Sequence, residues 1–258
     1  MGEFADLGVE IEDNIAVVEI KRPPFNYFDM ALIRGLADAF EALDQRDDCR
    51  AIVLCAEGKA FCAGANFGDG SRDRAKADRQ PGHLYIEAVR LFRCKLPVVG
   101  AIQGAAVGGG LGLALVPDFR VACPEARFSA NFTRLGFHPG FGLTATLPRV
   151  IGPTKAAMMF YTSRRIKGEE AYQMGLADML VARDELRESA IELAREITHC
   201  SPLGVAETRA TMRQGLADAV EAATEHELEI QNRLRETDDF AEGIAAMAAR
   251  RIPNFQGR

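Results

Sequence analysis

Apolar residues form short continuous runs along the chain, separated by stretches in which they recur every three or four positions. The runs Ile15–Ile20 and Ala51–Ala56 are β-branched or fully apolar and predict buried strands. Between them, apolar positions at helical spacing from residue 32 to 43, with Asp29 as a capping residue, predict a helix. Strand and helix alternate over roughly the first 200 residues, which favours an α/β core with parallel pairing.

The same patterns predict the later elements. They are a helix over 84–92, strands over 119–122 and 126–130, a loop over 136–142, and short helices over 143–150, 153–160 and 168–174. A polar segment over 68–82 predicts a surface loop. From residue 184 onward the pattern is helical throughout, with helices expected over 185–198, 203–214, 216–235 and 239–249.

A stretch without charges spans the 21 residues 96–116 and holds six of the 24 glycines. Its length would allow a membrane span. Its glycine content, the strand-like entry at Pro97-Val98-Val99 and the lack of an aromatic belt at its flanks argue against one. We predict a buried strand, a turn that needs close backbone approach, and a short buried helix that begins near Gly109.

Composition narrows the functional classes. The net charge of −6 argues against a broad surface for nucleic acid or anionic membrane. The acidic N-terminus has no apolar segment typical of a signal peptide. The six cysteines form no CxxC pair and mostly lie in apolar runs, where a thiol behaves as a small hydrophobe. We therefore expect a cytoplasmic protein without a metal site.

Several short motifs match only by letters. Residues 140–145 (GFGLTA) fit a dinucleotide-binding pattern, but they follow Phe137-His138-Pro139 instead of a strand. Asn131-Phe132-Thr133 has the form of a glycosylation sequon, which has no meaning without secretion. The sequence contains no phosphate-binding GxxxxGK[ST] loop and no HExxH motif, and its four histidines are scattered.

Two segments together are specific: residues 61–65 (FCAGA) and residues 97–110 (PVVGAIQGAAVGGG). They resemble the two signature segments of the crotonase superfamily, the enoyl-CoA hydratase/isomerase family. Supporting matches occur along nearly the whole chain, at Arg22-Pro23, Asp118, Gly136, Pro139-Gly140, Leu147-Pro148 and residues 250–255. The resemblance implies a spiral of βα (ββα) turns over 1–200 that binds acyl-CoA. It also implies an all-helical region over 201–258 that packs a homotrimer, often a dimer of trimers.

The implied chemistry is that of an acyl-CoA thioester whose enolate needs fixed hydrogen-bond donors. By resemblance, these donors are the backbone amides of Ala65 and Gly109, and glycine suits a turn that the ligand approaches closely. Coenzyme A enters as part of the substrate, and no separate cofactor is expected. Further substrate-binding positions implied by the resemblance are Ala63, Asn66, Gly108, Phe132 and Gly140.

The chain departs from the family pattern at two positions. Hydratases of the family carry glutamates at the places that Gly112 and Phe132 occupy here. Adding water across a double bond needs a base for the water and an acid for the α carbon. The resemblance therefore implies an atypical member that is not a standard two-glutamate hydratase.

His138, in the loop after Phe132, is the predicted catalytic residue because an imidazole titrates near neutrality. A second candidate pair is His83 and Glu87, which share a helix face at i, i+4. Asp118 is expected to be structural. Arg22, Arg250 and Arg251 are candidates for coenzyme A phosphates, although surface solubility explains each of them as well.

Three functional classes remain open at this stage. The first is an enzyme that stabilises an acyl-CoA enolate and transfers a proton through His138 or water. The second is a non-catalytic acyl-CoA-binding protein that has kept the pocket and lost the acids. The third is a C–C hydrolase of diketone-like substrates, which dispenses with coenzyme A.

Overall fold

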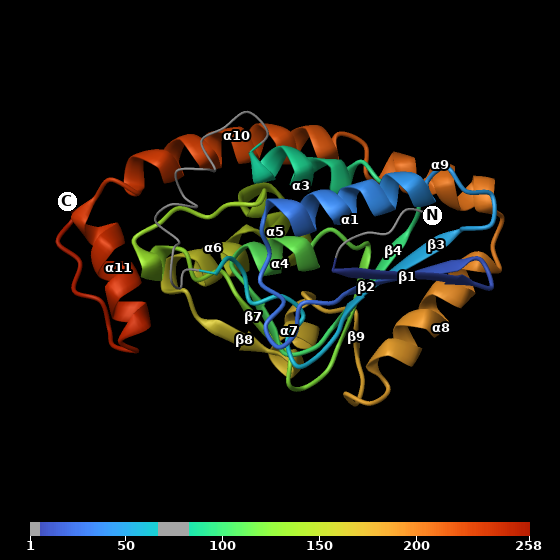
Figure 1. Cartoon of the computed structure of the whole chain (residues 1–258), viewed down its shortest axis with the longest axis horizontal. Coiled ribbons are helices and arrows are strands. Elements are labelled where there is room, and N and C mark those ends of the chain that lie inside the picture. The colour runs from blue at the N-terminus through green and yellow to red at the C-terminus, as the bar shows by residue number, and fades with distance from the viewer. Residues whose placement is uncertain (1–5, 67–82) are drawn as a thin grey trace.

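Six strands form the main sheet of the computed structural model, which describes residues 6–66 and 83–258 (Figure 1). Their order is β1-β2-β3-β4-β6-β9, and only β1 and β2 pair antiparallel. The strands are β1 (Leu7–Glu12), β2 (Ile15–Ile20), β3 (Ala51–Ala56), β4 (Val98–Ile102), β6 (Phe119–Ala122) and β9 (Met179–Leu180). The predicted α/β core with parallel pairing is confirmed.

A second, three-stranded sheet has the order β5-β7-β8, with β5 (Ala105–Val107), β7 (Arg127–Ser129) and β8 (Arg165–Lys167). β5 and β7 pair parallel, whereas β7 and β8 pair antiparallel. The chain runs from β4 to β5 and then into a helix, and from β6 to β7 and then into the 3-10 helix η1 (Thr133–Leu135). Each such step adds one strand to each sheet, which is the spiral of ββα turns that the sequence predicted.

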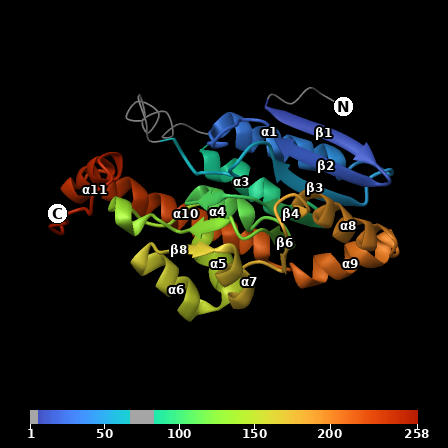
Figure 2. The ribbon, with the colours of Figure 1, turned by 90° about the horizontal axis from the view of Figure 1, so that it is seen from below.

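Helices enclose the sheets on opposite sides (Figures 1 and 2). α8 (Leu186–Thr198) packs on β2, β3, β4 and β6, while α1 (Met30–Leu43), α3 (Leu84–Phe92) and α10 (Leu216–Leu234) pack together in another layer. The remaining helices are α4 (Gly109–Ala114), α5 (Leu143–Ile151), α6 (Pro153–Thr162), α7 (Gly168–Met174), α9 (Pro202–Met212) and α11 (Asp238–Ala248). The predicted helical C-terminal region is confirmed as α9 to α11.

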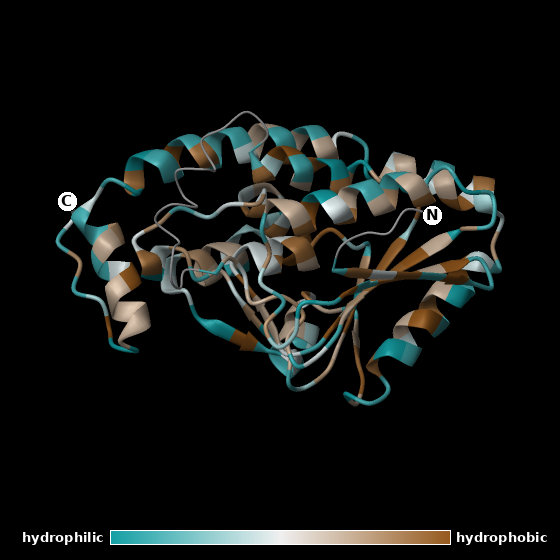
Figure 3. Cartoon of the chain, viewed as in Figure 1, coloured by the Kyte–Doolittle hydropathy of each residue, from teal (hydrophilic) through white to brown (hydrophobic). Residues whose placement is uncertain are grey.

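Local sequence explains where these elements begin and what they bury. The Asp29 side chain accepts a hydrogen bond from the backbone N–H of Leu32, as the predicted cap of α1. All six residues of β3 are buried, in agreement with a strand that is covered on both faces. Figure 3 shows the same contrast, with brown strands inside and helices that alternate brown and teal.

In the uncharged stretch 96–116, the predicted strand is β4 and the predicted buried helix is α4, and the short strand β5 lies between them. Every residue of α4 is buried, so its apolar sequence reflects a position in the core. Across residues 6–66 and 83–258, no helix combines the length and apolarity needed to cross a membrane.

Four strands were not predicted: β1, β5, β8 and β9. β1 carries acidic residues and a glycine and is only partly buried, while β5, β8 and β9 have three residues or fewer, too short for a periodic signal. The strand predicted over 126–130 is shorter, at Arg127–Ser129. The predicted loop over 68–82 falls outside the described residues.

Candidate active site

The two signature segments lie side by side in the structure. The Cys62 amide donates to the carbonyl oxygen of Ala105 at 2.9 Å, and the Val107 amide donates to the carbonyl of Cys62 at 3.1 Å. Cys62 therefore pairs with Ala106 in a parallel bridge. Ala65 lies three residues beyond Cys62 in one segment, and Gly109, the first residue of α4, lies three residues beyond Ala106 in the other.

Glycine is required where these segments touch. Gly64 has φ +91°, and a Cβ there would lie 2.7 Å from the carbonyl oxygen of Val107. A Cβ at Gly110 would lie 2.1 Å from the carbonyl oxygen of Cys62. The predicted close backbone approach is thus confirmed, and any larger residue at 110 would push the two segments apart.

Where the two segments meet, two backbone N–H donors have no acceptor among the described residues. The Gly108 amide donates to the Ser129 carbonyl at 2.8 Å, and the amides of Leu111 and Gly112 donate to the Gly108 carbonyl. For the amides of Ala65 and Gly109, the described part of the chain supplies no hydrogen-bond acceptor. Two backbone amides without an acceptor can donate hydrogen bonds to a ligand oxygen.

Phenyl rings border the glycine segment. A Cβ at Gly109 would lie 2.3 Å from the ring of Phe28, and a Cβ at Gly112 would lie 2.6 Å from the ring of Phe141. The rings of Phe28 and Phe141 are 5.8 Å apart between centroids. The ring of Phe141 thus fills the space into which a side chain at position 112 would project. The volume that a glutamate at 112 would need is apolar and occupied.

Asn131 and Phe132 border Gly108 at the end of β7. The Asn131 Oδ1 atom is 3.2 Å, and the Phe132 ring 3.7 Å, from the place of a Cβ on Gly108. Phe132 was expected at the substrate site, whereas no role was expected for Asn131. The only local signal was its place next to Phe132, and nothing in a sequon pattern points to a site inside the fold.

The loop that carries His138 and Phe141 is held by α3 and α10. The Gln231 Nε2 atom donates to the carbonyl of His138 at 2.9 Å, and the Tyr85 hydroxyl donates to Gln231 Oε1 at 2.8 Å. A Cβ at Gly140 would lie 1.9 Å from that hydroxyl oxygen, so Gly140 is a packing position between Tyr85 and Gln231. Burial raises the pKa of the Tyr85 hydroxyl.

A buried carboxyl group fixes the far side of the same loop. Glu227 of α10 is fully buried and accepts from the amides of Gly142 and Thr144 at 2.8 and 2.9 Å and from the Thr144 hydroxyl at 2.6 Å. Burial raises the pKa of the Glu227 carboxyl, although these hydrogen bonds oppose the rise. Phe141, at φ +65° between Gly140 and Gly142, is therefore held in place from both sides.

His138 is half-buried, and its Nδ1 atom lies 2.8 Å from the carbonyl oxygen of Pro139. A carbonyl only accepts, so in the neutral ring Nδ1 carries the proton and Nε2 carries the lone pair. The ring centroid is 6.4 Å from that of His226 on α10. His138 thus lies on the same loop as Phe141, whose ring packs against Gly112. The catalytic role of His138 stays a prediction.

The other predicted positions separate into two groups. Ala63, Ala65 and Asn66 lie in the segment beside Gly108 and Gly109, and Ala65 pairs with Phe28 in a second parallel bridge. The alternative candidates have other partners, which are Arg34 and Arg90 for Glu87, Asp6 and Asp29 for Arg22, and Glu242 for Arg251. Burial opposes the shift, but Arg90 and Arg34 lower the pKa of Glu87.

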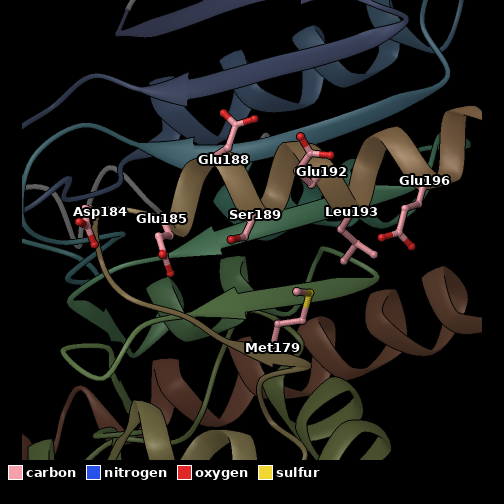
Figure 4. A pocket seen from close by; sticks show the side chains of 8 residues that line it. All are labelled: Met179, Asp184, Glu185, Glu188, Ser189, Glu192, Leu193 and Glu196. Carbon is pink, nitrogen blue, oxygen red and sulfur yellow. The ribbon is translucent and has the colours of Figure 1, made fainter.

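A hollow of about 410 Å³ lies elsewhere, along α8 (Figure 4). Its lining is Met179, Asp184, Glu185, Glu188, Ser189, Glu192, Leu193 and Glu196, and it includes none of the predicted site residues. Within residues 6–66 and 83–258, no group of three or more His, Cys, Asp or Glu side chains is arranged to hold a metal ion.

Comparison with known proteins agrees with the fold. The sequence model of the enoyl-CoA hydratase/isomerase family matches residues 10–258. A probable enoyl-CoA hydratase of Rhodobacter capsulatus is 32% identical over 253 residues, which cover 96% of this chain and 97% of that protein. A crotonyl-CoA hydratase of Syntrophomonas wolfei is 31% identical, with 98% of each chain covered. The crystal structure of an enoyl-CoA hydratase/isomerase from Pseudoalteromonas atlantica superposes with a TM-score of 0.87 at 27% identity, covering 97% of this chain and all of the other.

Proposed function

The chain belongs to the enoyl-CoA hydratase/isomerase family, and from that premise we propose that it is an enzyme that processes acyl-CoA thioesters through an enolate. The observation that carries the proposal is the pair of backbone amides, Ala65 and Gly109, which have no acceptor within the described residues and follow the Cys62–Ala106 bridge by three residues in each segment. Two such donors can bind the thioester oxygen and stabilise the negative charge that develops on it.

The reaction that we propose is not hydration by two glutamates. Position 112 has no side chain, and the ring of Phe141 takes up its space. Position 132 carries a buried phenylalanine. The proton transfer is therefore assigned to His138, whose Nε2 lone pair is left available when Nδ1 donates to the Pro139 carbonyl. A histidine can move one proton at the α carbon without help from a carboxylate.

The proposal extends to a homotrimer or a dimer of trimers. α9 buries none of its residues in the single chain, and Leu203 and Met212 on it are 79% and 69% exposed. Apolar side chains on a helix without buried residues suit a surface that another subunit covers. The mass of the native protein in solution, measured by light scattering, tests this assembly.

The direct test of the reaction class is exchange of the α protons of butyryl-CoA in heavy water, followed by NMR. The wild-type protein should exchange them, and His138→Ala should lower the exchange rate by about 10²-fold or more while the thioester still binds. His199→Ala, at the exposed end of α8, is the matched control and should exchange at the wild-type rate.

The alternatives give different results in the same experiment. Binding of butyryl-CoA without any exchange would identify a non-catalytic binding protein. Absence of binding would contradict an acyl-CoA site and return the diketone hydrolase to consideration. Exchange that is unchanged in His138→Ala would show that another group moves the proton.

A further inference from the structure

The side chains that border Gly108, Gly109 and Gly112 have one polar member. Three are the phenyl rings of Phe28, Phe132 and Phe141, and the fourth is the carboxamide of Asn131. Among the described side chains nearest to these three glycines, Asn131 is thus the one polar group. A single polar group in such a lining is the one that orients a ligand.

Asn131 differs from its neighbours in how its side chain is paired. The Thr133 hydroxyl, two residues on, donates to the Phe160 carbonyl at 2.6 Å and also contacts the Ser163 hydroxyl at 2.8 Å. The Asn131 carboxamide is half-buried and makes no hydrogen bond to any residue that the structure describes. A ligand oxygen beside Gly108 can supply a hydrogen-bond partner for this carboxamide.

The position of Asn131 is set by the fold, not by its own side chain. It lies two residues beyond Ser129, whose backbone carbonyl accepts from the Gly108 amide at 2.8 Å. That hydrogen bond keeps the end of β7 against the start of α4. The carboxamide is therefore held beside Gly108 before any ligand arrives, which is the preorganisation that a binding group needs.

We propose that the Asn131 carboxamide binds a neutral oxygen, hydroxyl or keto, on the acyl group of the substrate. The inference rests on the proposed function, because it presupposes an acyl-CoA whose thioester oxygen lies between Ala65 and Gly109. Those two amides occupy both lone pairs of that oxygen, so a further donor beside them serves a different acceptor. The carboxamide does not titrate, which makes Asn131 a binding residue and not a proton carrier.

A neutral oxygen fits better than a carboxylate on this acyl group. The neighbours of the carboxamide at the glycine segment are phenyl rings, and none of these side chains carries a positive charge. A buried carboxylate without a cation is strongly disfavoured. A carboxamide can both donate and accept, so it can pair with either a hydroxyl or a keto group.

The experiment compares the affinities of 3-hydroxybutyryl-CoA and butyryl-CoA by calorimetry. The wild-type protein should bind the hydroxylated thioester about tenfold more tightly than the plain one, because only the former satisfies Asn131. Asn131→Leu, of similar size, should abolish this preference and leave the affinity for butyryl-CoA within about twofold, since the amide donors are untouched. The ratio of the two affinities is insensitive to a general loss of folded protein.

Two further variants keep the test decisive. Asn232→Leu changes another half-buried asparagine, on α10, and should keep the wild-type preference. Asn131→Asp removes the NH₂ donor at nearly constant shape and should weaken binding of both thioesters. If Asn131→Leu keeps the preference, or if the wild type binds both thioesters equally, the role of Asn131 is refuted and the proposed function stands. If neither thioester binds the wild type, the proposed function fails as well.

Discussion

Two regions beside the buried segment 96–116 pair their polar groups in opposite ways. Just past its C-terminal end, the Asp118 carboxylate accepts from the Val98 amide at 2.8 Å, from Arg209 at 2.8 Å and from Arg213 at 2.7 Å. Beside Gly108–Gly112, the Asn131 carboxamide and the amides of Ala65 and Gly109 have no hydrogen-bond partner within the described residues. The rings of Phe28, Phe132 and Phe141 border the glycines of this region.

The difference separates groups that hold the fold from groups that await a ligand. Most buried polar atoms that serve the fold find partners inside the chain, because an unmade hydrogen bond is costly; beside Asp118, Nη2 of Arg209 and Nε of Arg213 are exceptions among the described residues. Asp118 ties β4 to α9 in this way, which agrees with the structural role expected from the sequence. The amides of Ala65 and Gly109, which have no acceptor within the described residues, can donate to a substrate oxygen.

Removing the Asp118 carboxylate should have a large effect on stability, matched below only by Phe141→Ala. Asp118→Ala leaves the guanidinium groups of Arg209 and Arg213, 10% and 13% exposed, without their carboxylate. Loss of one partner from a buried ion pair costs about 3–5 kcal/mol, so the free energy of unfolding in urea should fall by about that amount. The α-proton exchange rate per folded molecule should stay unchanged.

The control for this variant is Glu192→Ala. Glu192 pairs with Arg195 on the exposed side of α8, and its removal should leave the urea midpoint where it is. If Asp118→Ala lowers α-proton exchange per folded molecule, the Asp118 cluster and the region beside Gly108–Gly112 are coupled. In that case the assignment of one to the fold and the other to the ligand is wrong.

The pair Gly112 and Phe141 should show an effect of intermediate size. Gly112→Ala places a Cβ 2.6 Å from the Phe141 ring, and overpacking of this kind costs about 1–3 kcal/mol. Phe141→Ala opens a cavity and costs about 3–5 kcal/mol. In the double variant the new methyl group enters that cavity, so the loss should be smaller than the sum by about 0.5–3 kcal/mol.

Unfolding of the four proteins in urea measures this coupling. Strictly additive losses would mean that Phe141 does not fill the space of residue 112. In that case the volume of the Phe141 ring could not explain why position 112 carries no carboxylate.

Glu227 should give the smallest effect, visible as a pH dependence. Burial raises the pKa of its carboxyl, so the folded protein keeps the proton at a pH where the unfolded chain has lost it. This contribution to stability is fully present below the ordinary carboxyl pKa of about 4.3 and is lost as the pH rises to the folded-state pKa. Glu227→Gln keeps a hydrogen-bond acceptor and cannot titrate.

The stability of the wild type relative to Glu227→Gln should therefore fall as the pH rises through that window and then level off. Urea unfolding at a series of pH values measures the difference. A difference that grows with pH would show that the hydrogen bonds from Gly142 and Thr144 outweigh burial, and that Glu227 resembles Asp118 as a charged structural anchor.

Much of this architecture follows from local patterns. The fully buried run of β3, the Asp29 cap of α1 and the strand–turn–helix of residues 96–116 each have a signal that one segment carries alone. The two glycine-containing signature segments also point to close backbone approach, which Gly64 and Gly110 bear out.

The surroundings of the site could not be read in the same way, because they depend on distant segments. Phe28, Asn131 and Phe141 meet at the glycine segment only in three dimensions. The hydrogen bonds from α10 that hold the His138 loop join residues more than 80 positions apart. No periodicity within a short window reports such contacts.

The central claim is that the amides of Ala65 and Gly109 bind the thioester oxygen, and infrared spectroscopy of an isotope-labelled thioester carbonyl tests it most directly. On binding to the wild type, the carbonyl stretch should move to lower frequency. Gly109→Ala, whose Cβ would lie 2.3 Å from Phe28, should reduce that shift and lower α-proton exchange by about 10²–10³-fold. Gly204→Ala, with its nearest contact at 3.5 Å, should behave as the wild type. A carbonyl stretch that is the same in the bound and the free thioester would contradict the account.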